Sequence, residues 1–158
     1  MSRKILFLCT ANSCRSILSE AVFNHYAPAG WRAYSAGSFP KGVVHPLTLK
    51  TLQQAGIRTE GLYSKSSDDL ADLHPDIVIT VCDKAAGEAC PVFFGSAVKA
   101  HWGLSDPSEC QGSEADMDAA FAATLAHISR RTQALLSLPL DQMNAEALLS
   151  ELQRIGQL

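Results

Sequence analysis

Apolar and polar positions follow two different spacings along this chain, and the two spacings alternate. Short stretches with apolar residues predict strands at residues 5–8, 31–35, 76–81 and 97–102, and the β-branched run within 76–81 is typical of a strand buried on both faces. Segments with an apolar residue at every third or fourth position predict helices at residues 17–26, 45–55, 113–136 and 144–155. A further short helix is predicted to begin at Ser66 or Ser67. This alternation predicts an α/β fold, with a four-stranded parallel sheet and helices on both of its faces.

The composition is that of a globular protein of about one domain. The chain has 158 residues, of which 47% are hydrophobic and 18% are charged. Its net charge of -3 gives no general attraction to nucleic acid, and no apolar run reaches the ~18 residues of a membrane-spanning helix. The start of the chain lacks the apolar stretch of a signal peptide, and the five cysteines include no Cys-x2-Cys pair. We therefore expect a cytoplasmic protein with reduced thiols, no metal, no cofactor, and no nucleic-acid or membrane partner.

The first predicted strand runs directly into a loop of small polar residues that joins a cysteine to an arginine. The loop and its flanks read Cys9-Thr10-Ala11-Asn12-Ser13-Cys14-Arg15-Ser16. A loop between a strand and the start of a helix aims free backbone N–H groups at one point, where the helix dipole also favours an anion. We predict that residues 10–16 bind an oxyanion, with the planar fork of Arg15 on two oxygens and Asn12 in a left-handed conformation.

Cys9 is expected at the base of this loop as a nucleophile. The loop and Arg15 are predicted to lower its pKa below the usual value of about 8.5, so that thiolate is present at neutral pH. The alternative is a reduced, buried cysteine near a surface arginine. The preceding apolar strand and the small residues of the loop favour the functional interpretation, which is nucleophilic attack on a bound oxyanion.

Two further cysteines follow the third predicted strand. Cys82 comes directly after residues 76–81, so we expect it at the same edge of the sheet as Cys9. Cys90 comes eight residues later, across a small, polar segment that contains Gly87. Two ordinary thiols in a loop are one interpretation of this pair. A thiol–disulfide relay is the other, and the expected neighbourhood of a nucleophilic cysteine favours it.

Asp106 and Pro107 follow the fourth predicted strand, again at its carboxyl end. Proline favours an extended conformation of the residue before it, which would direct the Asp106 carboxyl into the site. A general acid at this point would protonate a leaving oxygen. Because an Asp-Pro pair alone is a common turn signal, this prediction depends on its position relative to Cys9 and Arg15.

Together these residues resemble the low-molecular-weight tyrosine phosphatase superfamily, and within it the thiol-dependent arsenate reductases, over residues 5 to about 136. The resemblance also includes Glu20, Tyr34-Ser35-Ala36-Gly37, His45-Pro46, Ser64-Lys65-Ser66, Cys90-Pro91 and His101-Trp102-Gly103-Leu104-Ser105-Asp106-Pro107. Both branches share the motif that begins at Cys9, whereas Cys82, Cys90 and the His-Trp-Gly stretch resemble the reductases. Phosphatases of this fold place an aromatic residue after the Asp-Pro pair, where this chain has Ser108 and Glu109.

The resemblance implies reduction of arsenate to arsenite, for arsenic detoxification. In that chemistry the Cys9 thiolate attacks arsenate held by the loop amides and Arg15, and Asp106 helps an oxygen to leave. Cys82 then attacks the Cys9 sulfur, arsenite departs, and Cys90 moves the disulfide to the surface. Thioredoxin, or glutathione with glutaredoxin, is the expected electron donor; the longer gap between the last two cysteines leaves this choice open. The alternatives are a phosphatase, or a non-catalytic sensor that binds an oxyanion or arsenite through the same thiols.

Two other departures from the resembled family concern a lysine and the end of the chain. Some members bind potassium through residues that resemble Asn12, Glu20 and Ser35. Lys65 stands where those members have an acid, so we expect its ammonium to replace the ion. The last predicted helix extends beyond the usual end of the family. We expect residues 1–138 to form the phosphatase-like domain and residues 139–158 to form a helical extension packed on it.

Overall fold

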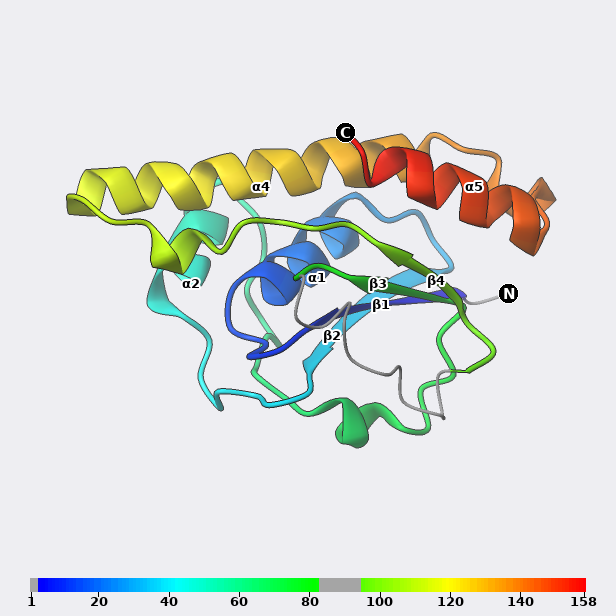
Figure 1. The fold of residues 1–158 in the computed structure, drawn as a ribbon, viewed down its shortest axis with the longest axis horizontal. Helices are drawn as coiled ribbons and strands as arrows, with labels where there is room; N and C mark the ends of the chain where they lie inside the picture. Colours follow the sequence, from blue (N-terminus) through cyan, green and yellow to red (C-terminus); the bar gives the residue numbers. More distant parts are fainter. Residues whose placement is uncertain (1–2, 83–94) are drawn as a thin grey trace.

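The computed structural model describes residues 3–82 and 95–158, and within them a parallel sheet of four strands forms the centre (Figure 1). The strands are β1 (Arg3–Cys9), β2 (Trp31–Gly37), β3 (Ile77–Thr80) and β4 (Val98–His101), in the order β2-β1-β3-β4. The register places Cys9 opposite Gly37, Leu8 opposite Thr80, and Thr80 opposite His101. The carboxyl ends of all four strands therefore meet at one edge, and the predicted fold class is confirmed.

Four long helices of the described chain lie close to the predicted residues, and a polar side chain caps the start of three of them. They are α1 (Arg15–Tyr26), α2 (Pro46–Gln54), α4 (Glu114–Leu136) and α5 (Ala145–Ile155). The Ser113 side chain accepts a hydrogen bond from the Asp116 backbone N–H, and the Asp116 carboxylate accepts one from Ser113 in return. The Asn144 side chain accepts from the backbone N–H of Ala147. The predicted ranges of these two helices include the capping residue, whereas the observed helices begin one residue after it.

Three element boundaries differ by two residues from the prediction, the first being the start of β1 at Arg3 instead of residue 5. α1 begins at Arg15 instead of residue 17. Its first two residues, Arg15 and Ser16, are polar, so the apolar pattern does not mark them as helical. β2 continues to Gly37 instead of ending at residue 35, because its last residues still pair with Leu8 and Cys9 of β1. Backbone pairing and helical geometry thus extend beyond the apolar pattern from which the elements were predicted.

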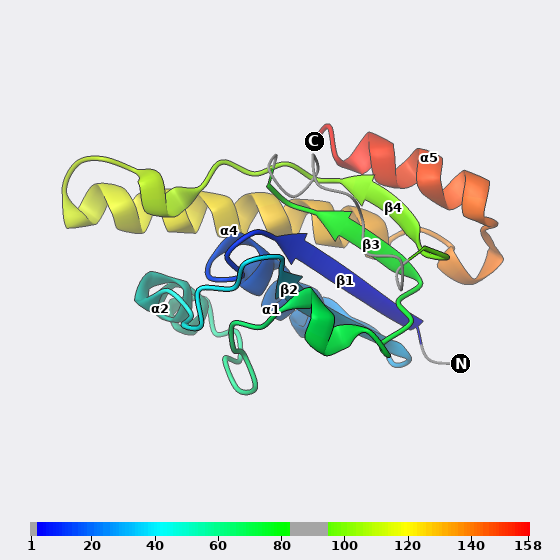
Figure 2. The ribbon, with the colours of Figure 1, turned by 60° about the horizontal axis from the view of Figure 1, so that its bottom comes forward.

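Both faces of the sheet are covered, as Figure 2 shows from a second direction. On one face, side chains of β1 such as Phe7 pack with helices α1, α4 and α5, through Phe23, Leu135 and Leu152. The opposite face packs with the segment of the short 3₁₀ helix η1 (Ser67–Leu70) and is formed by Leu6, Leu8, Ala36, Val78 and Ala97, with Leu70 and Leu73. Successive residues of β1 therefore point into two different clusters, as expected of a strand with no solvent-exposed face.

The end of the chain packs against the sheet and the long helix, and Figure 1 shows α5 running beside α4. Leu148, Leu152 and Ile155 of α5 are buried in the same cluster as Trp102, whose indole N–H donates to the Leu152 carbonyl at 2.9 Å. Within the described residues, no helix is both long enough and apolar enough to cross a membrane.

Arg131 of α4 joins the chain after β4 to the end of α5. Its side chain is 4% exposed and donates to the carbonyl oxygens of Gly103, Gly156 and Leu158 at 3.1, 3.0 and 3.4 Å. The neighbouring Arg130 is exposed. A buried arginine that caps three carbonyls is a structural contact, and the sequence pattern did not separate it from its neighbour.

Replacing Arg131 by methionine should destabilise the protein, because three partly buried carbonyls each lose a hydrogen bond from its guanidinium. We expect a loss of about 2–4 kcal/mol, or roughly 5–15 °C in Tm. Arg130→Met is the matched control and should change stability by less than ~0.5 kcal/mol. Urea unfolding of the two variants measures the difference, and equal losses would contradict the assignment.

Candidate active site

The loop that follows Cys9 forms a cradle at the carboxyl edge of the sheet. Cys9 is the last residue of β1 and is 4% exposed, while α1 begins at Arg15. Cys14 occupies the N-cap position of α1 but its side chain makes no capping hydrogen bond. The first N–H groups of the helix are therefore left to the loop and to any anion bound there, where the helix dipole adds a favourable field.

Asn12 holds the loop in shape from inside the protein. It has the predicted left-handed conformation, with φ 48°, and its side chain is fully buried. Its amide nitrogen donates to Ser16 Oγ at 2.8 Å and to Ser35 Oγ at 3.0 Å, and its amide oxygen accepts from the Lys65 N–H at 2.9 Å. The side chain thus connects the loop to α1, β2 and the chain before η1. Asn12 and Ser16, two of the residues predicted to bind the oxyanion, act here as internal supports of the loop.

A buried ion pair continues this network. Ser35 Oγ donates to Glu20 Oε1 at 2.6 Å, and Lys65 Nζ lies 3.6 Å from the same oxygen. Lys65 is 5% exposed, and its ammonium also donates to the Tyr63 carbonyl at 3.0 Å. Burial raises the pKa of Glu20, while Lys65 and the Ser35 hydroxyl oppose that rise. The lysine ammonium therefore lies beside Glu20, where the resemblance led us to expect it.

The chain after β2 lies directly against the cradle because Gly37 has no side chain. A Cβ atom at Gly37 would overlap the Thr10 carbonyl oxygen. The backbone N–H of Phe39 donates to Thr10 O at 3.0 Å, and that of Lys41 donates to Ala11 O at 2.9 Å. In the sequence, this glycine is notable only as the last residue of the Tyr34-Ser35-Ala36-Gly37 motif. Its role in bringing residues 38–45 to the cradle emerges from the close approach of two backbones.

Arg15 and Asp106 come together from positions 91 residues apart. The Arg15 guanidinium donates to the Leu104 carbonyl at 3.0 Å and lies 3.5 Å from Asp106 Oδ2. The other carboxylate oxygen, Oδ1, accepts from the Ser108 N–H at 2.9 Å and from the Ser108 hydroxyl at 2.7 Å. Asp106 is extended, with φ -76° and ψ 110°, as expected of the residue before Pro107. The predicted acid and the predicted cation therefore share one site.

Cys82 lies beside Cys9, also as predicted. It is 3% exposed, follows β3, and its Sγ lies 3.6 Å from Thr10 Oγ1. The side chains of Cys9 and Cys82 share a hydrogen bond. Cys90, the third member of the predicted relay, falls outside the described residues.

The predicted net lowering of the Cys9 pKa is wrong for this arrangement. The pKa of Cys9 is raised, first by the hydrogen bond with Cys82 and then by burial. Arg15 and the Thr10 backbone do lower the pKa, as the sequence analysis expected, but they are outweighed. Two adjacent thiols do not readily ionise together, and the sequence analysis considered the loop without the second thiol.

The cradle encloses a cavity of about 60 Å³. Cys9, Ala11, Ser13, Cys14 and Arg15 line it, and burial raises the pKa of the Cys14 thiol. Lys41, His45, Asp106 and Ser108 complete the lining. Thr10 and Cys82 line a wider neighbouring groove of about 900 Å³ that shares Arg15 and Asp106. The sequence did not indicate Lys41 or Ser108 as site residues, and it gave His45 no catalytic role. All three are distant from Cys9 along the chain, and only the fold brings them to the cavity.

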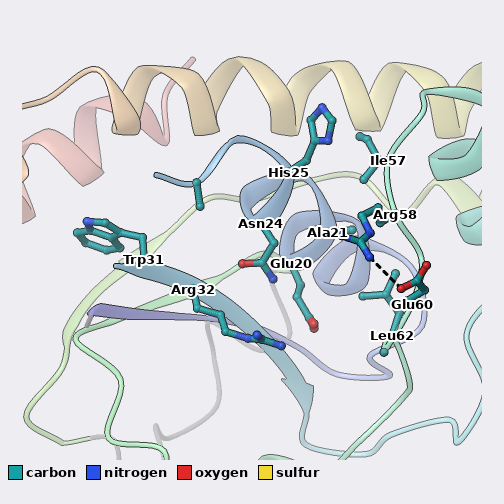
Figure 3. Close-up of a pocket in the computed structure, with 12 residues that line it drawn as sticks. Glu20, Ala21, Asn24, His25, Trp31, Arg32, Ile57, Arg58, Glu60 and Leu62 are labelled. Atoms are coloured by element: carbon teal, nitrogen blue, oxygen red, sulfur yellow. Dashed lines mark hydrogen bonds and ion pairs between the residues drawn. The ribbon is translucent and has the colours of Figure 1, made fainter. Parts of the chain in front are cut away.

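Figure 3 shows a further cavity, about 470 Å³, beside α1. Side chains of α1, the start of β2 and residues 57–62 line it, with the Arg58–Glu60 ion pair on one side. Cys9, Arg15 and Asp106 line the 60 Å³ cavity instead, which places the predicted chemistry there. Within the described residues, no group of three histidine, cysteine or acidic side chains is arranged to hold a metal ion.

Replacing Cys82 by alanine should lower the pKa of Cys9, because both the hydrogen bond and the charge of Cys82 raise it. At neutral pH, iodoacetamide should then alkylate Cys9 about tenfold faster than in the parent protein. Mass spectrometry of the reduced protein without added oxyanion gives the rate. Cys110→Ala removes a different thiol and serves as the control. An unchanged or slower rate in Cys82→Ala would show that Cys82 does not control this thiol.

Comparison with known proteins agrees with the geometry. The family model described as low molecular weight phosphotyrosine protein phosphatase matches residues 4–152 and reaches into α5. A protein of Bacillus licheniformis named arsenate reductase is 37% identical over 136 residues, which cover 83% of this chain and 94% of that protein. An arsenate reductase of Bacillus subtilis is 35% identical over 132 residues, with the same coverage.

A similar solved structure is described as an arsenate reductase in the phosphate binding state. It matches with a TM-score of 0.69 and 26% identity, over 85% of this chain and 97% of its own. The matched regions include the strand, loop and helix that form the cradle, and the family model spans nearly the whole chain. The chain belongs to the low molecular weight phosphotyrosine protein phosphatase family.

Proposed function

We propose that this protein reduces arsenate to arsenite with its own thiols. The observation that carries the proposal is the second thiol, Cys82, in hydrogen-bond contact with the thiol at the base of the anion cradle. Hydrolysis of a phosphate ester is redox-neutral and needs one nucleophile. Reduction of arsenate by two electrons must oxidise a partner, and two adjacent thiols supply the electrons by forming a disulfide. The arsenate reductases at 35% and 37% identity support this choice of substrate.

In the first step, Cys9 Sγ attacks the arsenic atom of arsenate bound in the 60 Å³ cavity. A sulfur–arsenic bond forms and one oxygen leaves as water. Arg15 and the loop N–H groups bind the remaining oxygens, and Asp106, whose carboxylate lies beside Arg15, relays the proton released by Cys9 to the leaving oxygen, which departs as water. The raised pKa of Cys9 requires that its proton be removed as the substrate binds, and an arsenate oxygen is the base at hand.

In the second step, the Cys82 thiolate attacks Cys9 Sγ. A disulfide forms, the sulfur–arsenic bond breaks, and arsenic leaves as arsenite with the electron pair of that bond. The short path between the two sulfurs needs no large movement of β1 or β3. The Thr10 hydroxyl, 3.6 Å from Cys82 Sγ, is a hydrogen-bonding partner for this sulfur during the exchange.

Cys90 completes the cycle in this proposal. Its thiolate attacks Cys82, which frees Cys9 and leaves a Cys82–Cys90 disulfide. A cytoplasmic thiol reductant, thioredoxin or glutathione with glutaredoxin, returns both sulfurs to thiols. In the same scheme the Lys65 ammonium takes the place of a potassium ion beside Glu20, which keeps the Asn12 network intact without a bound ion.

The proposal is tested by arsenate-dependent oxidation of NADPH, coupled through thioredoxin and its reductase and repeated with glutathione and glutaredoxin. The parent protein should turn over with at least one donor. Cys9→Ser should lower the rate by at least about three orders of magnitude, because a serine hydroxyl has no comparable thiolate fraction. Cys110→Ala should leave the rate unchanged. Appreciable turnover by the serine variant would rule out the mechanism.

Cys82→Ser separates reduction from hydrolysis. Arsenate reduction should be lost with both donors, since no second thiol is in place to form the disulfide. Slow hydrolysis of para-nitrophenyl phosphate should persist, because it requires only Cys9, Arg15 and Asp106. Undiminished arsenate turnover would remove Cys82 from the reaction. Efficient aryl-phosphate hydrolysis by a parent protein that leaves arsenate unreduced would instead favour a phosphatase.

A further inference from the structure

The cradle receives side chains from a segment that the oxyanion motif does not include. Lys41 and His45 lie between β2 and α2, and both line the 60 Å³ cavity together with Cys9 and Arg15. We propose that they form a second recognition wall for a tetrahedral oxyanion. The Lys41 ammonium attracts and holds the anion, and the His45 Nε2–H donates to one of its oxygens. In its application to arsenate this inference rests on the proposed function.

The negative charges expected at the cavity exceed the positive charge of Arg15, which favours a second cation at this site. Arg15 lies 3.5 Å from Asp106, so that much of its charge is already balanced by a carboxylate. A bound oxyanion brings one or two further negative charges, and the Cys9 thiolate adds another during the reaction. Among the side chains that line the cavity, Lys41 is the other cation. Its ammonium restores an excess of positive charge where the anion binds.

Lys41 also differs from the other lysines in the described part of the chain. Lys50 pairs with Asp118 and Lys65 with Glu20, while Lys4 and Lys99 donate to backbone carbonyls. Among the described residues, Lys41 has no carboxylate or carbonyl partner for its ammonium. The ammonium of a lysine that lines an anion cavity and has no carboxylate or carbonyl partner among the described residues is available to a ligand.

The backbone of this segment is fixed to the cradle itself. The Lys41 N–H donates to Ala11 O at 2.9 Å, and the His45 N–H donates to Ser13 O at 3.1 Å. Between them, the Gly42 N–H donates to Ser64 Oγ at 3.2 Å, and this hydroxyl donates to Ala11 O at 3.2 Å. Both side chains therefore start from points that move with the anion-binding loop.

The role of His45 follows from its hydrogen bond to the helix that it caps. Its Nδ1 accepts from the Leu47 N–H at 3.0 Å, so that the proton of the neutral ring lies on Nε2. The ring also packs against Phe121, with 5.2 Å between ring centroids. Capping and packing hold the ring in one tautomer and one place, with a donor available at the wall of the cavity.

Binding of inorganic phosphate to the reduced protein, measured by calorimetry, tests the wall without any turnover. Lys41→Gln should weaken phosphate binding about tenfold, and Lys41→Arg should restore most of it. Lys50→Gln removes an equal charge outside the cavity and should bind within about twofold of the parent protein. The deficit of Lys41→Gln should shrink at high ionic strength, which a loss of structure would not produce.

His45→Asn keeps an N-cap acceptor for α2 while it removes the Nε2–H donor. It should bind phosphate about threefold more weakly, with a thermal unfolding transition close to that of the parent protein. In the arsenate assay, Lys41→Gln should raise KM more than it lowers kcat, because the ammonium attracts substrate and transition state alike.

The proposed role of Lys41 would be wrong if Lys41→Gln bound phosphate as tightly as the parent protein, or if Lys50→Gln lost as much phosphate affinity as Lys41→Gln. If phosphate binding depends on Lys41 while no form of the protein reduces arsenate, the proposed function fails and the wall stands. If arsenate is reduced and the Lys41 and His45 variants bind phosphate as the parent protein does, the second recognition wall is wrong and the proposed function stands.

Discussion

The site depends on one buried residue in an uncommon conformation. Asn12 sits at φ 48° in the middle of the cradle and satisfies its side chain through Ser16, Ser35 and the Lys65 backbone. A left-handed residue costs free energy unless its surroundings fix it, and here three elements do so. The Glu20–Lys65 ion pair adds a charged support behind it. The shape of the loop is therefore set by buried side chains that lie behind it.

The parallel sheet supplies the second constraint. Because β1, β3 and β4 all end at one edge, the chain delivers Cys9, Cys82 and Asp106 to the same place from three separate segments. Proximity changes their chemistry. The neighbouring thiol raises the pKa of Cys9, opposite to the effect of the loop and Arg15 taken alone. The Cys82 thiol makes ionisation of Cys9 less favourable, and the same thiol lies where a disulfide with Cys9 can form.

Much of the fold and part of the site could be predicted before the structure. The apolar pattern located the four described strands and the four longest described helices, since burial on both faces leaves a continuous apolar run and burial on one side leaves a helical period. The motif after β1 indicated the anion cradle, and Pro107 indicated the extended Asp106. Lys41 and Ser108 left no such trace, because an exposed lysine and a serine after proline are common in any loop. Gly37 stood out only as part of a motif shared with the resembled family, although its missing side chain lets the chain that leads to Lys41 lie against the cradle.

The sequence by itself determined the order of elements, the parallel sheet and the loop that follows Cys9, because these depend on local spacing and on residues close together in the chain. Only the tertiary structure decided which distant groups share the cavity. It paired Arg15 with Asp106, set Cys82 against Cys9, and placed Lys65 beside Glu20. The pKa of Cys9 belongs to this second class. A pKa is set by charge, hydrogen bonding and burial in three dimensions, and the strongest influence on Cys9 comes from a residue 73 positions away.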